Sequence, residues 1–219
     1  MSGIPESLRN FVVFYSFPPS PMYMRLSILL VLAALLLGAF PSGPPSSPPS
    51  DGAVGVDDGK VGLIQQIFFL NKMKPDVKRV GLIWKKGLPN QKDKLETAKR
   101  AVASIGGTLY VGYVEGASEV ADQFRLLTRK HDVQALWVVE NDGIVNASTP
   151  QKYLIENAIE NGVPLLAPTQ DWVHAGAPVA IAKPNGELQI MLNEPAATAT
   201  GLQVPDKYKS QTTPVVAAN

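Results

Sequence analysis

The feature that most constrains the fold of this chain is an alternation of short apolar runs with amphipathic helical patterns between Lys78 and Pro168. Four of the runs are too short and too continuously apolar to be helices, and they end in small or polar residues. Such runs are typical of strands that are buried on both faces of a parallel sheet. The predicted strands are 80–84, 109–113, 135–139 and 163–167.

Helical patterns fill the intervals between these strands, and each has its own start signal. Asn90 is expected to cap the first helix and Ser118 the second. Thr149 is expected to cap the third, with Pro150 at the first helical position, where the missing N–H costs nothing. The residues expected to face the core are Leu95, Ala98, Val102 and Ile105, then Val120, Phe124 and Leu127, then Leu154, Ile155, Ala158 and Ile159.

Strand, helix and strand repeated with right-handed crossovers predict a three-layer α/β/α sandwich around a doubly wound, mostly parallel sheet. A further helix at 60–74 is expected to pack on this sheet. A strand near 187–193 is expected to extend it. The apolar residues of the additional helix, which we expect in the core, are Val61, Ile64, Ile67, Phe68 and Met73.

The overall composition excludes several functional classes. Lys plus Arg is 20 against 19 for Asp plus Glu, so the chain has no field of one sign to attract nucleic acid. It has no cysteine, which excludes disulfides, thiolate metal sites and a thiol nucleophile. Nucleic acid is therefore not an expected partner.

The first sixty residues have the composition of an export signal and a linker. Residues 1–21 contain no predicted element and are read as unstructured or as a mis-called start. In 22–40, Arg25 precedes an uncharged run of about 15 residues, the arrangement of a signal peptide's n- and h-regions. A bilayer-spanning helix needs about 20 residues. No A-x-A-like pair precedes Pro41, so a cleaved signal and an uncleaved membrane anchor both remain open, and either predicts a periplasmic or other extracytoplasmic domain.

The rest of the chain divides by composition. The Pro, Ser and Gly content of 41–59 predicts a linker. Residues 60–208 are expected to form the folded α/β domain. A disordered tail is expected at 209–219.

The order of several segments resembles one lobe, the C-terminal lobe, of the ABC-transporter substrate-binding proteins. The branch it resembles most includes binders of aromatic amino acids. The segments that carry the resemblance are Lys-Pro-Asp-Val-Lys-Arg-Val-Gly-Leu-Ile-Trp at 74–84, Leu-Pro-Asn at 88–90, Asp-Val-Gln-Ala-Leu-Trp-Val at 132–138, Gly-Val-Pro-Leu-Leu-Ala at 162–167, the closing strand at 187–193 and Gly-Leu-Gln-Val-Pro at 201–205.

This resemblance implies a periplasmic-binding-protein-like lobe that belongs to an ABC importer. Its partners would be a small organic solute, such as an amino acid, and a membrane permease, and it would need no cofactor. Family members close two lobes around the ligand by a hinge. Too few residues precede 60 to build a second lobe, so a membrane-tethered sensor or protein-interaction module without a transport role is the alternative.

Ligands of open parallel sheets bind beyond the carboxyl ends of the strands, where loops converge and helix N-termini offer N–H groups. Aromatic, amide and carboxylate side chains follow the predicted strands at that place, and these groups suit an amino acid. The candidate ligand-binding residues are Trp84, Asn90, Asn141, Asp142, Gln170, Asp171 and Trp172. A homodimer in which two such rims face each other is an open possibility.

A purely structural interpretation of the same residues stays open as well. In it Trp84 belongs to the core, Asn90 and Asp93 cap a helix, and Asp142 with Gly143 makes a turn.

Catalysis has little support in the sequence. His131 is expected before a strand, at its amino end, and His174 lies past the last rim loop, so neither has a partner for a triad or a metal site. Neither a G-x-G-x-x-G turn after the first strand nor a G-x-x-x-x-G-K-[ST] loop occurs. An enzyme of the same sheet class is a third hypothesis without a catalytic constellation, and we expect no enzymatic activity, metal or cofactor.

Overall fold

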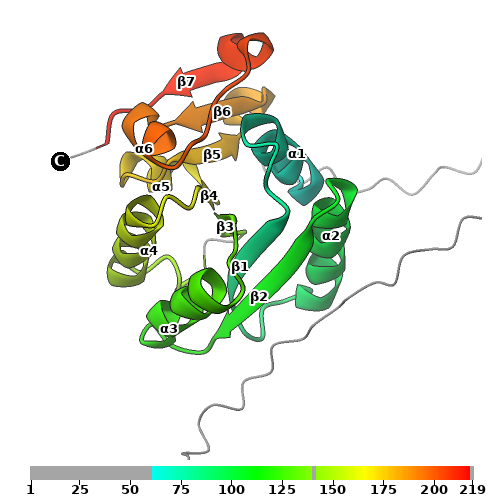
Figure 1. Ribbon diagram of the computed structural model, residues 1–219, viewed down its shortest axis with the longest axis vertical. Helices are drawn as coiled ribbons and strands as arrows, with labels where there is room; N and C mark the ends of the chain where they lie inside the picture. Colours follow the sequence, from blue (N-terminus) through cyan, green and yellow to red (C-terminus); the bar gives the residue numbers. More distant parts are fainter. Residues whose placement is uncertain (1–60, 140–141, 218–219) are drawn as a thin grey trace, which may run out of the picture. The chain divides into compact units, whose positions relative to one another are not determined.

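The computed structural model describes residues 61–139 and 142–217. The predicted segments 1–21, 22–40 and 41–59 lie outside the described residues, as do Glu140 and Asn141. The described chain folds into a seven-stranded sheet with helices packed on both faces (Figure 1). The predicted α/β class and three-layer arrangement are confirmed.

The strands and helices follow one another in the predicted alternation. The strands are β1 (Arg79–Lys85), β2 (Thr108–Val114), β3 (Ala135–Trp137), β4 (Leu165–Ala167), β5 (Val179–Ala182), β6 (Gln189–Leu192) and β7 (Thr212–Pro214). The α-helices are α1 (Leu63–Met73), α2 (Gln91–Ser104), α3 (Glu119–Arg125), α4 (Ser148–Glu160), α5 (Gln170–His174) and α6 (Glu194–Ala199). A π-helical turn, η2 (Leu126–Lys130), continues α3, and the 3-10 turns are η3 (Pro184–Gly186) and η4 (Asp206–Gln211).

The sheet has the strand order β2-β1-β3-β4-β5-β6-β7. The first five strands are parallel, β6 is antiparallel to β5, and β7 is parallel to β6. All residues of β3 and β4 are buried, which explains why both read as continuous apolar runs. We call the edge where β1 to β5 begin the amino edge, and the edge where they end the carboxyl edge.

Two apolar clusters fill the space between the sheet and its helices. On one face Ile67 and Leu70 of α1 and Val102 of α2 pack on the sheet. On the other face Phe124 of α3 and Leu154 of α4 do so. Figure 1 shows α1 and α2 on one side of the sheet and α3 and α4 on the other. The centre of each predicted stripe is therefore buried, whereas Leu95, Ile105 and Ile159 at the stripe ends are only partly buried.

The predicted inward face of α1 is only partly right. Ile67 and Met73 are buried, but Ile64 is 55% exposed and Phe68 is 44% exposed. Ile64 and Phe68 lie one turn apart on the outer face of the helix, because residues at i and i+4 share a face. The ammonium of Lys72 lies 5.1 Å from the Phe68 ring centroid.

The predicted capping side chains are also wrong in detail. Asn90 does precede α2, but its φ of 52° is left-handed and its side chain makes no cap. Ser118 precedes α3 without a side-chain cap. Helix α4 begins at Ser148, so Thr149 is not its cap and Pro150 lies in the first turn rather than at the first position. A proline is tolerated there because the first-turn N–H groups have no intrahelical partner.

The chain beyond residue 167 contains elements that the sequence did not predict, among them β5, α5 and β7. The expected disordered tail at 209–219 instead supplies β7, where Thr212 pairs with Ile190 and Val215 N donates to Leu192 O at 2.8 Å. Strands this short, with polar or proline-containing sequence, carry too little periodicity to be recognised.

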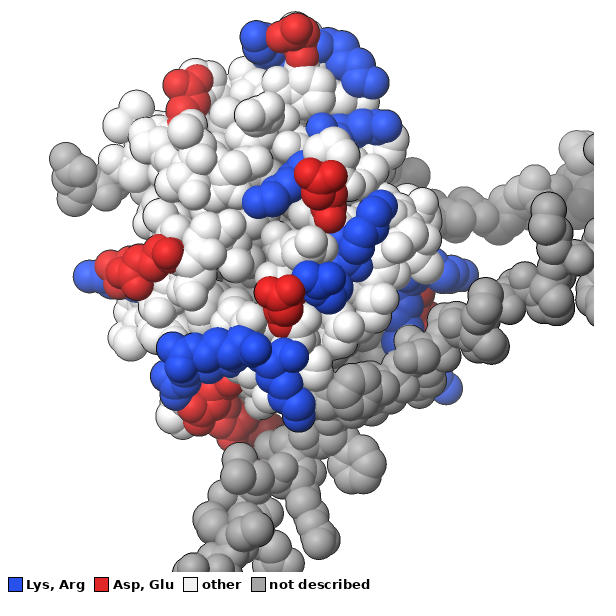
Figure 2. All heavy atoms as spheres, in the orientation of Figure 1, with Lys and Arg blue, Asp and Glu red and all other residues white. Residues whose placement is uncertain are grey.

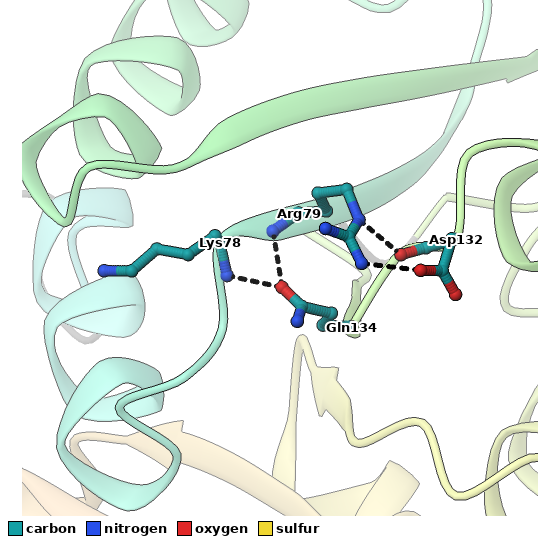
Figure 3. A network of polar contacts seen from close by, with 4 residues as sticks. All are labelled: Lys78, Arg79, Asp132 and Gln134. Carbon is teal, nitrogen blue, oxygen red and sulfur yellow. Dashed lines mark hydrogen bonds and ion pairs between the residues drawn. The ribbon is translucent and has the colours of Figure 1, made fainter.

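Polar side chains fasten β1 to β3 at the amino edge (Figure 3). Gln134 Oε1 accepts from the backbone N–H groups of Lys78, at 2.7 Å, and Arg79, at 3.1 Å. Arg79 donates from Nε to Asp132 O at 2.7 Å, and its guanidinium pairs with the Asp132 carboxylate at 2.6 Å. Asp132 has a left-handed φ of 49°, and its carbonyl oxygen and one carboxylate oxygen both accept from Arg79. These groups satisfy one another and fix the start of β3.

Candidate functional site

The carboxyl edge has a topological switch point between β1 and β3. The chain leaves β1 toward α2, which covers one face of the sheet, and leaves β3 toward α4, which covers the other. The two connections therefore part at this place and leave room beyond the strand ends, which is where open α/β sheets bind ligands. The predicted rim residues follow β1, β3 and β4 at this edge.

Trp84 lies at the end of β1 but does not present its ring to solvent. Its side chain is 1% exposed, and it lies on the same face of the strand as Val80, which packs in the cluster beneath α1 and α2. Its indole Nε1 is buried and has no hydrogen-bond partner in the described part of the chain. Trp84 therefore offers no aromatic surface to solvent. What it has at this edge is a buried indole N–H without an acceptor in the described residues.

The segment between β1 and α2 is shaped by Gln91 rather than by Asn90. Gln91 Oε1 accepts from Gly87 N at 2.9 Å, and its Nε2 donates to Lys85 O at 2.7 Å. Asn90 is exposed, and its left-handed backbone directs the chain into α2. The start of α2 is thus left without a side-chain cap, and its N-terminal N–H groups face the carboxyl edge.

Asp142 is committed to the loop that follows β3. Its side chain is buried, and Oδ1 accepts from Ile144 N at 2.8 Å and from Val145 N at 2.7 Å. This is the turn-forming role of an Asp whose side chain bonds the backbone two and three residues on. The predicted site residue next to it, Asn141, lies outside the described residues.

The three predicted residues after β4 lie on α5 and differ in exposure. Gln170 and Asp171 are exposed, whereas Trp172 is fully buried. The indole N–H of Trp172 donates to Asn146 Oδ1, which ties α5 to the loop after β3. Of the predicted set, Asn90, Gln170 and Asp171 therefore offer side chains to solvent at this edge.

Sequence reasoning missed Gln91 and Asn146, which hold loops of the carboxyl edge in shape, and Gln66 in the core. Gln66 accepts from Trp137 Nε1 at 2.8 Å and donates to Val61 O at 3.0 Å, so it joins α1 to β3. For Gln66 a signal was available in the sequence, because it is a polar residue within the predicted helix 60–74 whose other core positions are apolar. Gln91 and Asn146 lie in polar segments where no pattern separates them from their neighbours.

Charges around the carboxyl edge are mixed. Lys86 pairs with Glu115 at 2.6 Å, and this hydrogen bond raises the pKa of Lys86 above its ordinary value. Figure 2 shows Lys and Arg beside Asp and Glu over one face of the described chain. Lys85 is the half-buried cation at the end of β1.

Among residues 61–139 and 142–217, no group of three or more His, Asp or Glu side chains could hold a metal ion. No helix in these same stretches is long and apolar enough to cross a membrane.

A protein-family model matches most of the chain. The model of the ABC transporter substrate binding protein family matches residues 44–202 of the chain. The chain belongs to this family. Its members bind substrates rather than convert them, and they are usually extracytoplasmic.

Solved structures of low sequence identity share the fold. One is an ABC domain in complex with L-Trp from Streptococcus pneumoniae, with a TM-score of 0.60 and 17% identity over 71% of this chain and 60% of that chain. A conserved domain protein from Vibrio cholerae has a TM-score of 0.61 and 16% identity over 72% and 61%. The ligand-free, open structure of a Clostridium difficile substrate binding protein with adhesive properties has a TM-score of 0.59 and 19% identity over 72% and 61%.

The present chain therefore spans about 60% of the length of these structures. No curated protein sequence matches it.

Proposed function

We propose that this chain is the solute-binding component of an ABC importer, and that it binds a small organic solute such as an amino acid at the carboxyl edge. The observation that carries the proposal is the switch point between β1 and β3 in a chain of the substrate-binding family. This edge holds uncapped N–H groups at the start of α2 and exposed polar side chains at the start of α5.

An amino acid can be recognised by the groups at this edge. Its carboxylate suits the N-terminal N–H groups of α2, beside which Asn90 lies. Its ammonium suits the exposed carboxylate of Asp171 and the amide oxygen of Gln170. Asn141 remains a candidate contact, and Asp142 acts by holding the loop after β3. Trp84 and Trp172 then contribute by their position in the core and not as stacking surfaces.

The remaining parts of the proposal concern place and partners. An exported, extracytoplasmic domain would deliver its solute to a membrane permease, and a homodimer with facing edges would enclose more of the solute than one edge can. Cell fractionation tests export. Recovery of the intact chain in the cytosol only would contradict it.

A second candidate function is a membrane-tethered sensor or protein-interaction module. The fact that favours it is that the described residues form a single sheet with its helices, and one such lobe buries less of a solute than two lobes do. Such a module predicts protein partners and no saturable solute binding.

Calorimetry of the full chain against the common amino acids separates the two functions. Asp171→Ala should weaken the binding of an amino acid about tenfold, because a charged hydrogen bond is lost. Asp76→Ala is the matched control, since Asp76 is an exposed carboxylate at the amino edge and its loss should leave affinity unchanged. If no amino acid binds at millimolar concentration, the importer proposal fails and the tethered module replaces it.

A further inference from the structure

The three tryptophans of this chain differ in one respect. All three are buried, with Trp84 1% exposed and the other two fully covered. Trp137 donates from Nε1 to Gln66, and Trp172 donates to Asn146. Trp84 alone among them keeps a buried N–H without an acceptor in the described residues. A buried donor of this kind is uncommon in native proteins and calls for a specific reason.

The position of Trp84 supplies a reason. It is the next-to-last residue of β1, and β1 borders the switch point with β3. Helix α2 covers the face of the sheet that Val80 and Trp84 share, and it begins at Gln91 without a side-chain cap. A helix N-terminus favours an oxygen that carries negative charge. The surroundings of the Trp84 N–H therefore suit an anionic acceptor better than a neutral or cationic group.

We propose that the Trp84 indole N–H donates to a carboxylate oxygen of the bound solute. The inference rests on the proposed function and assigns a specific donor to the carboxylate of its solute. It also changes the role of Trp84 from an aromatic surface to a hydrogen-bond donor. Because Nε1 is buried in the present structure, a carboxylate oxygen reaches it only when the groups that cover it move aside on binding.

Nuclear magnetic resonance of the full chain labelled with ¹⁵N at tryptophan tests this inference, because each indole N–H gives its own signal. The probes are the common L-amino acids and, for each one that binds, the amine that lacks its carboxylate. We expect a binding amino acid to move the Trp84 signal downfield and to slow its hydrogen exchange. The Trp137 signal should stay in place, since its acceptor is Gln66. The amine should bind more weakly and leave the Trp84 signal unmoved.

A variant of near-identical shape provides the second arm. Replacing Trp84 by 3-benzothienylalanine, in which sulfur takes the place of the N–H, should lower amino acid affinity about tenfold without lowering the stability of the free protein. The same replacement at Trp137 is the control and should leave affinity unchanged.

The possible failures are distinguishable. If an amino acid binds while the Trp84 signal and the variant's affinity both stay unchanged, the N–H is satisfied by a buried water and this inference is overturned, although the proposed function stands. Equal binding of the amine overturns it in the same way. If no amino acid binds, the proposed function fails and the inference fails with it.

Discussion

At the amino edge of the sheet Gln134 accepts from two backbone N–H groups and Arg79 pairs with Asp132, whereas at the carboxyl edge Trp84 retains a buried donor without a partner and α2 begins without a side-chain cap. Both edges belong to the same strands, β1 and β3. They differ in whether the chain's own groups complete the hydrogen bonding.

This difference separates a structural edge from an edge suited to binding. A donor that the protein satisfies itself contributes to folding and leaves nothing for a ligand. A buried donor without a partner lowers the stability of the free protein. A ligand that supplies the acceptor removes this penalty, which favours binding. The carboxyl edge is not loose, however, because Asp142, Gln91 and Asn146 hold its loops in shape.

The largest effect on stability should come from a charge placed in β3, which runs from the amino edge to the carboxyl edge. Trp137→Asp is expected to cost more than about 4 kcal/mol of unfolding free energy and to leave the chain unfolded, because an unpaired charge would lie between two helix layers. Trp137 is fully buried, and Gln66 would also lose its donor. Urea unfolding followed by circular dichroism measures this.

Trp137→Phe is the control, since it keeps an apolar side chain and should remain folded. A Trp137→Asp protein with a midpoint near that of the parent would contradict the buried position of β3.

A smaller effect on stability should follow from the loss of hydrogen bonds at the amino edge. Gln134→Leu removes the acceptor of two backbone N–H groups, so we expect it to lower the unfolding free energy by about 1–2 kcal/mol. Gln134→Glu keeps an oxygen at the same place and should cost less. Neither change should alter solute affinity, because the amino edge is complete without a ligand. A loss of affinity in Gln134→Leu equal to that of Asp171→Ala would contradict the division between the edges.

At the carboxyl edge, Asp142 tests whether a side chain shapes a loop or contacts the solute. Asp142→Ala removes the acceptor of the Ile144 and Val145 N–H groups and should cost about 1 kcal/mol in stability, with weaker solute binding. Asp142→Asn keeps an oxygen acceptor and should retain affinity to within about twofold. If both variants lose affinity equally, the charge of Asp142 itself contacts the solute.

The smallest expected effect concerns pH at the amino end of β3. His131 is buried and stacks on Tyr110 at 4.7 Å between ring centroids, and burial, with a smaller effect of Lys130, lowers its pKa. The unfolded chain therefore binds a proton more readily than the folded chain. Stability should be complete above the ordinary histidine pKa of about 6.5 and should decline as the pH falls below it. Thermal unfolding at pH values from 8 to 5 measures this decline in the parent. The part of the decline that comes from His131 should be missing in His131→Gln.

The sequence predicted the parallel core because its strands and helices carry strong local patterns, whereas the site at the carboxyl edge stays a prediction. Continuous apolar runs located β1 to β4, and helical stripes such as Val120, Phe124 and Leu127 located the crossovers. The short elements β5, α5 and β7 were not predicted, because three to five residues carry too little periodicity. The burial of Trp84, near the end of β1, and of Trp172, in α5, could not be predicted, because the sequence does not show whether such a ring turns inward or outward. Only packing decides that direction.

Backbone amide chemical-shift mapping with the tightest-binding amino acid tests the central claim most directly. We predict that the shifts gather at the carboxyl edge, in 85–90, 142–147 and 168–172, while 78–79 and 132–134 at the amino edge stay unchanged. Shifts gathered at the amino edge, or along the outer face of α1 at Ile64 and Phe68, would contradict a solute site at the carboxyl edge.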